Sequence, residues 1–185
     1  MIKDVEELAI WPEIPKDVFE KYKKKGDSTM NIFIDIMIIP SSFEKEGVNM
    51  GAYDYNKLCN SQNALLAFQR LLFWDSYGYT EYFGSFDEDC KDIFNSSVLN
   101  YMKSCGAEKL AALVEEGIIL YDTYKDEIER LKGHTWLEFS GTYQMIKEEF
   151  DILTNKIDEI NFDSEKEIIK KYVEEHPSRY VKIIG

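Results

Sequence analysis

Cysteine and histidine are scarce in this sequence, and their scarcity excludes several kinds of site. The three cysteines, Cys59, Cys90 and Cys105, are odd in number and far apart. A disulfide framework is therefore not expected, and a reducing compartment such as the cytoplasm fits better. The two histidines, His134 and His176, belong to no HExxH or ExxH pattern. We expect the cysteines to fill the core and the histidines to lie at helix ends.

The signature motifs of enzymes are missing as well. The sequence has no glycine-rich phosphate loop, no GxSxG elbow and no CxxC pair. Its longest apolar run, residues 32–39, is interrupted by Asp35, and no secretory signal is expected at the start. The sequence predicts a cytoplasmic protein that is not an enzyme, does not enter a membrane, and has no cofactor or metal site.

Positively charged residues are also few. The chain has 22 lysines and arginines against 35 aspartates and glutamates, a formal net charge of −13, so direct binding to nucleic acid is disfavoured. Residues 65–129 hold 13 of the acids and only 5 of the bases, and this middle third is the most anionic part. Many proteins are acidic simply for solubility, and that explanation stays open.

The clearest feature that is present is helical periodicity. From Gly106 to Leu131, apolar residues recur every three or four positions, and a second stripe covers 135–160, where Thr135 and Glu138 form a capping box. The connection at 132–134 is short, so the two stripes should pack as an antiparallel hairpin. The first stripe consists of Leu110, Val114, Gly117, Tyr121, Tyr124, Ile128 and Leu131.

Shorter patterns predict further helices around this hairpin. Residues 63–75 suit a central buried helix, 95–104 a shorter one, and Pro15 opens a helix that ends near Gly26. Residues 32–39 fit a strand or a helix; we expect a helix, because Asp27 and Ser28 offer a cap and no second convincing strand is evident. A last helix should start at Ser164, capped reciprocally by Glu167, and end before His176-Pro177.

These patterns together predict an all-α fold. We expect a multi-helix bundle with a long central helical hairpin in residues 55–185, preceded by a helical extension in 1–54.

One short stretch is unusually aromatic. Residues 73–86 read FWDSYGYTEYFGSF, with seven aromatic rings in fourteen positions. We expect a structural corner that closes the core, with DEDCKD at 87–92 as a solvated acidic segment. The rings could also serve a protein partner or a homodimer, or they could line a small-molecule pocket. The candidate pocket residues are Trp74, Asp75, Tyr77, Tyr79 and Tyr82.

The order of these segments resembles the bacterial DNA mimic protein family. The run QRLLFWDSYGYTEYFGS at 69–85 is followed by FNSSVLNYMKSCGAEKLAALVEEGIILY at 94–121, which includes the Gly-Ala step at 106–107, and KKYVEEHPSRYV at 170–181 resembles the family's ending. The turn carries Tyr77-Gly78-Tyr79, whereas the family usually has Asn-Gly-Gly before its aromatic residue.

The resemblance implies an all-helical domain whose acidic surface imitates the phosphates of DNA. The expected partner is a basic DNA-binding protein such as a regulator. An immunity or antitoxin protein that neutralises a basic toxin is the alternative. The expected partner-binding residues are Glu81, Asp87, Glu88, Asp89, Asp92, Glu108, Glu115, Glu116, Asp122, Asp126 and Glu129.

Overall fold

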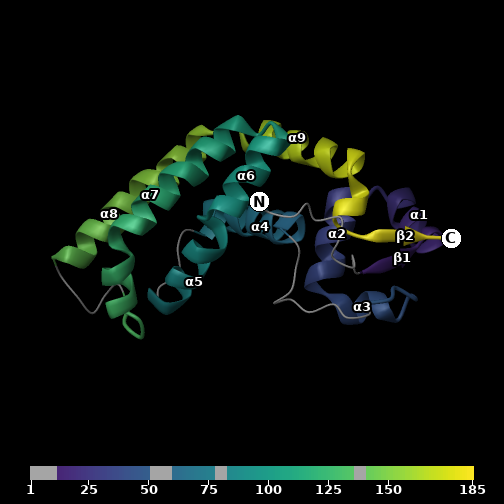
Figure 1. The fold of residues 1–185 in the computed structure, drawn as a ribbon, viewed down its shortest axis with the longest axis horizontal. Helices are drawn as coiled ribbons and strands as arrows, with labels where there is room; N and C mark the ends of the chain where they lie inside the picture. Colours follow the sequence, from purple (N-terminus) through teal and green to yellow (C-terminus); the bar gives the residue numbers. More distant parts are fainter. Residues whose placement is uncertain (1–11, 51–59, 78–82, 136–140) are drawn as a thin grey trace. The chain divides into compact units, whose positions relative to one another are not determined.

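The computed structural model describes residues 12–50, 60–77, 83–135 and 141–185. These residues are mostly helical, so the expected all-α class is confirmed, and their one sheet is a short parallel pair (Figure 1). The helices are α1 (Lys16–Lys24), α2 (Thr29–Ile38), α3 (Pro40–Glu44), α4 (Asn60–Tyr77), α5 (Phe83–Ile93), α6 (Ser96–Cys105), α7 (Glu108–Arg130), α8 (Thr142–Glu159), α9 (Phe162–Glu175) and the short 3₁₀ helix η3 (Pro177–Arg179); the strands are β1 (Glu13–Pro15) and β2 (Lys182–Ile184).

The chain divides into two compact units. The terminal unit joins Met1–Leu66 to Glu167–Gly185, and the central unit is Ala67–Lys166. The boundary expected between residues 54 and 55 falls in the segment 51–59, outside the described residues.

The terminal unit brings the two ends of the described chain together. Strand β1 pairs with β2 in parallel, with Ile14 opposite Ile183. Strands of three residues carry too little pattern to be recognised in a sequence, and neither was predicted. The expected helix at 32–39 is confirmed as α2, whose first turn is capped by Ser28: its Oγ accepts a hydrogen bond of 3.1 Å from the backbone N–H of Asn31.

The core of the central unit is built on α7, which packs against α5, α6 and α8. Figure 1 shows α7 and α8 running side by side, so the predicted helical hairpin is confirmed. On α7 every residue of the expected stripe is buried except Tyr124, which is half-buried. The facing stripe of α8 contributes five buried side chains: Tyr143, Ile146, Phe150, Leu153 and Ile157. The second predicted helix, at 135–160, begins only at Thr142, after Gly141 with a φ of 88°. The start expected at Thr135 is wrong, because Thr135 is not helical; Glu138, its expected capping partner, lies outside the described residues.

Helices α5 and α9 also differ from the predictions. Helix α5 was not predicted at all. Helix α9 begins at Phe162 rather than at Ser164, because Asn161 acts as the cap: its Oδ1 accepts a hydrogen bond of 3.2 Å from the backbone N–H of Ser164. The predicted end of α9 before His176-Pro177 is confirmed. In the part of the chain that the structure describes, no helix combines the length and apolar character needed to cross a membrane.

Candidate acidic interface

The exposed face of α7 carries a row of carboxylates. The helix contains seven acidic and three basic residues, and its apolar stripe turns inward, so most of the acids face solvent. Glu108, Glu115, Asp122 and Glu129 repeat every seven residues, which places them along one side of the helix at intervals of ~10.5 Å. Asp126 lies on the same side. We call these five exposed residues the α7 ridge.

Part of the negative charge on the α7 ridge is offset by lysines. Glu115 lies 3.4 Å from Lys103, and Glu129 lies 2.6 Å from Lys132. Asp122 pairs with Lys125 at 3.4 Å, and all these side chains are well exposed. Exposed pairs of this kind contribute only ~0–1 kcal/mol, so a competing cation can displace Lys103 or Lys125 at little cost. Lys132 differs, because it also lies 3.1 Å from the carboxylate of Asp87. Among the described residues, Glu108 and Asp126 form no ion pair.

Asp87, expected in a solvated segment, is buried instead. It lies in α5 with 1% of its surface exposed, because Phe86, Cys90 and Ile93 on the same helix face the core. Its Oδ1 accepts a hydrogen bond of 2.5 Å from the hydroxyl of Tyr121 on α7. The expectation of a solvated segment at 87–92 is wrong for Asp87 and Cys90.

Two lysines complete the surroundings of Asp87. Its Oδ2 lies 2.5 Å from Lys91 Nζ and 3.1 Å from Lys132 Nζ. Burial raises the pKa of Asp87, but hydrogen bonds from Lys91, Tyr121 and Lys132 outweigh it, so the pKa lies below its usual value. Burial and the bond to Asp87 raise the pKa of Tyr121 well above its usual value. Asp87 therefore joins α5 to α7 and is not available to a partner.

The remaining acids of α5 lie closer to solvent. Arg70 of α4 bridges Asp89 and Asp92, with N–O distances of 3.0 Å to each carboxylate. Burial raises the pKa of Asp89 above its usual value, and Arg70 offsets only part of this rise. Glu88 is exposed. Since Asp87 is buried, the acids of α5 that remain for an acidic surface are Glu88, Asp89 and Asp92. Glu81, which precedes α5, lies outside the described residues.

In the aromatic stretch, residues 73–77 belong to α4 and 83–86 to α5, but the side chains of 73–83 are not described. Tyr79 and Tyr82 lie in the segment 78–82, and Trp74, Asp75 and Tyr77 belong to α4 but their side chains are not described. Phe86, the last residue of the quoted stretch, is fully buried and meets Phe150 of α8 edge-on, with ring centroids 4.7 Å apart. This contact agrees with a structural role for the end of the bend.

A groove between α7 and α8 has no counterpart in the sequence predictions. It encloses about 340 Å³ and includes Glu116, the one expected partner-binding residue of α7 that lies off the ridge. Across it, Glu116 forms an ion pair of 2.5 Å with Lys156 of α8. The signal in the sequence was Ile119, an apolar residue on the polar side of α7, and it is 63% exposed.

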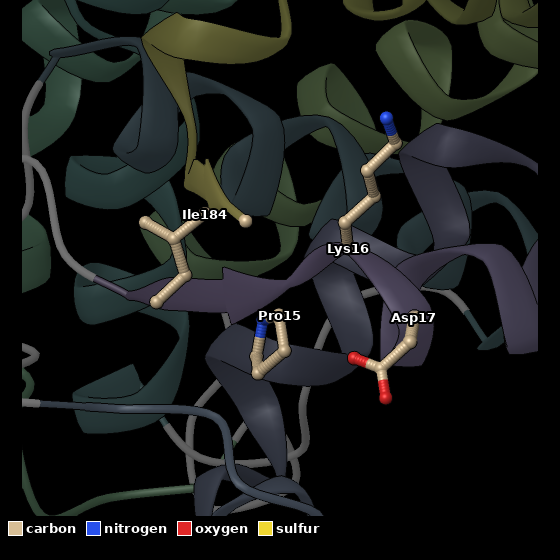
Figure 2. Close-up of a pocket in the computed structure, with 5 residues that line it drawn as sticks. Pro15, Lys16, Asp17 and Ile184 are labelled. Atoms are coloured by element: carbon tan, nitrogen blue, oxygen red, sulfur yellow. The ribbon is translucent and has the colours of Figure 1, made fainter.

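A second hollow, of about 590 Å³, lies in the terminal unit at the start of α1. Figure 2 shows Pro15 and Ile184 beside it, with Lys16 and Asp17 projecting in different directions. The hollow is wide and open, and the opposite charges of Lys16 and Asp17 cancel. It therefore lacks the convergent polar groups that fix a small ligand.

The described residues offer little chemistry beyond charge. They contain no cluster of three or more histidine, cysteine, aspartate or glutamate side chains placed to hold a metal ion. Cys90 is buried, and burial raises the pKa of its thiol well above the usual value, so it is a core residue rather than a reactive thiol. His176 stacks on Tyr172 at the end of α9, with ring centroids 4.3 Å apart, as expected for a helix-terminal residue.

The excess of negative charge belongs almost entirely to the central unit. Its sequence, Ala67–Lys166, holds 21 of the 35 acids and 10 of the 22 bases, a net charge of −11 out of −13. The terminal unit, with 14 acids and 12 bases, is close to neutral. Comparison with protein-family models, with curated proteins and with solved structures finds no match for this chain.

Proposed function

We propose that this protein is a cytoplasmic interaction protein without catalytic activity, and that the α7 ridge binds a basic DNA-binding protein in the manner of a DNA mimic. The observation that carries the proposal is the alignment of Glu108, Glu115, Asp122, Asp126 and Glu129 on one exposed face of a unit with a net charge of −11. A surface of one sign attracts a partner of the opposite sign and steers its approach.

The charge spacing along the α7 ridge can be compared with the charge spacing of duplex DNA. Five carboxylates over 22 residues give one charge per ~6 to 8 Å of helix axis, whereas duplex DNA carries one per ~1.7 Å. The ridge is thus a sparser array than DNA, with about half the charge density of a single strand, which carries one phosphate per ~3.4 Å of axis. Because Glu115 and Asp122 are each paired only with an exposed lysine, an arginine or lysine of the partner can replace those contacts.

A variant that removes charge from the ridge tests the proposal. In Glu115→Gln/Asp122→Asn/Asp126→Asn the side chains keep their size but lose three charges. Wild-type protein on a solid support should capture basic DNA-binding proteins from the native lysate at low salt and release them as salt rises; the variant should capture markedly less.

The matched control removes three exposed charges from the terminal unit, in Asp17→Asn/Glu20→Gln/Glu44→Gln. It should capture as much as the wild type. Equal capture by the wild type and the ridge variant, or partners retained at high salt, would contradict the proposal. Recovery of a basic nuclease as the sole partner would favour the immunity-protein alternative.

A further inference from the structure

The groove between α7 and α8 has two edges of the same form. On α7 the lining residues include Glu116, Ile119, Leu120 and Thr123, and on α8 they are Glu149, Ile152, Leu153 and Lys156. Each set follows the spacing i, i+3, i+4, i+7, so each edge is a single helix face ~10.5 Å long. Tyr124 extends the α7 edge by one residue. Two helix faces, each about two turns long, thus border the open groove.

Each edge of the groove carries one exposed isoleucine. Ile119 is 63% exposed and Ile152 is 52% exposed, although most large apolar side chains of the central unit are buried. Met145, one turn before Glu149 on the same face of α8, is 45% exposed. Three large apolar side chains on one helical hairpin form a patch of the kind that marks a protein-binding site.

The two ends of the groove differ in charge. Glu116 at one end is neutralised by Lys156 across the groove, with an N–O distance of 2.5 Å. Glu149 is exposed, and among the described residues it forms no ion pair. The α7 ridge runs past the same groove, because Glu115 and Asp122 lie one turn before and one turn after Ile119. The surroundings of the apolar trough are therefore acidic.

We propose that this groove receives a basic amphipathic helix of the protein partner. Apolar side chains of that helix at i and i+3 or i+4 contact Ile119 and Ile152, and its lysines or arginines lie against Glu149 and the α7 ridge. The groove is two helical turns long and offers no sheet edge, so a helix fits it and an added strand does not. A second copy of this chain is disfavoured, because it would bring together two units of net charge −11.

This inference rests on the proposed function, since it names the form of the basic partner. Two labelled peptides separate it from simple charge attraction. One is a helix of leucine, lysine and alanine, about 18 residues long, with leucines every three or four positions. The other has the same composition with its leucines spread around the helix. Fluorescence anisotropy measures both affinities, and circular dichroism checks the fold of every variant.

The wild type should bind the amphipathic peptide about tenfold more tightly than the scrambled one. Ile119→Ser/Ile152→Ser should abolish this preference while keeping the salt-dependent binding of the scrambled peptide. The control Ile38→Ser/Ile39→Ser changes two isoleucines of the terminal unit that are 53% and 48% exposed, and it should keep the preference. Glu149→Gln should weaken binding of the amphipathic peptide more than Glu116→Gln does, because Lys156 already occupies Glu116.

Other outcomes overturn the inference in distinguishable ways. Equal binding of both peptides, unaffected by the isoleucine substitutions, would contradict docking in the groove but would remain consistent with binding of a basic partner by the α7 ridge. Binding of neither peptide would contradict both proposals. Self-association of the wild type that is lost in Ile119→Ser/Ile152→Ser would identify a second copy of the chain as the occupant.

Discussion

At the scale of single residues, Asp87 shows how an acid that looks exposed in the sequence can be structural. It is buried in α5 and accepts hydrogen bonds from Tyr121, Lys91 and Lys132. A buried carboxylate is stable only when its oxygens are hydrogen-bonded, and here both are. The apolar spacing of Phe86, Cys90 and Ile93 was readable in the sequence, but the partner Tyr121 lies 34 residues away and was not.

The pKa shifts of two neighbouring acids of α5 give opposite pH dependences. The folded-state pKa of Asp87 is lowered, so its stabilisation is present above its unfolded pKa of about 3.9 and is lost as the pH falls below it. Asp87→Asn should lower the free energy of unfolding by about 2 kcal/mol at pH 7, with a smaller loss near pH 3. Urea titrations across this pH range measure both values.

Asp89→Asn is the matched control for this pH dependence. Burial raises the folded-state pKa of Asp89, so the wild type gains stability relative to Asp89→Asn as the pH falls from 7 towards 4. The stability difference from wild type should thus shrink on acidification for Asp87→Asn and change in the opposite direction for Asp89→Asn. The same trend in both variants would show that Asp87 is not held as its surroundings indicate.

At the scale of elements, long apolar stripes were predictable and short or mixed ones were not. Helices α7 and α8 carry stripes of several turns, which define both the helix and its inward face. Helix α5 was missed because four acids in eleven residues hid its apolar spacing. Strands β1 and β2 have three residues each, and they pair only because the fold brings the two ends of the described chain together.

The contact between α7 and the end of α5 depends on a glycine. A Cβ at Gly117 would lie 2.2 Å from Cδ1 of Phe94, a core residue that is only 4% exposed. Alanine favours helix over glycine by about 1 kcal/mol, but this overlap outweighs the gain. Gly117→Ala should lower the free energy of unfolding by about 1–3 kcal/mol in urea titrations.

Two further variants separate the steric effect from helix propensity. Ala112→Gly, at an exposed position of α7, should cost only about 1 kcal/mol. Phe94→Leu combined with Gly117→Ala should be more stable than the two single effects together predict, because the smaller side chain makes room for the methyl group. A Gly117→Ala protein more stable than the wild type would refute the close packing of Phe94.

At the scale of the whole molecule, the sequence predicted where charge accumulates but not which surface presents it. The acid-rich segment 65–129 lies within the central unit apart from its first two residues, so that part of the prediction transfers directly to the structure. The groove between α7 and α8 could not be predicted, because it depends on the register of the two helices, which aligns Ile119 with Ile152. Periodicity defines the buried face of each helix, whereas a surface groove depends on the exposed residues beside that face.

The concentration of charge in one unit should make thermal stability depend on salt. Raising sodium chloride from about 0.01 M to about 0.1 M shortens the Debye length from ~30 Å to ~10 Å, which screens repulsion across the central unit. The melting temperature should rise by about 2 °C or more, corresponding to ~1 kcal/mol. Screening also weakens the exposed ion pairs, but each contributes less than ~1 kcal/mol.

Two single substitutions locate the source of this salt dependence. Asp126→Asn removes a charge near the C-terminal end of α7, where the helix dipole disfavours an acid, so it should raise the melting temperature at low salt and reduce the salt effect. Glu20→Gln, in the nearly neutral terminal unit, should do neither. A melting temperature that falls with added salt would mean that the ion pairs outweigh the net repulsion. The lysines beside the α7 ridge would then hold its carboxylates too firmly for a partner to replace them.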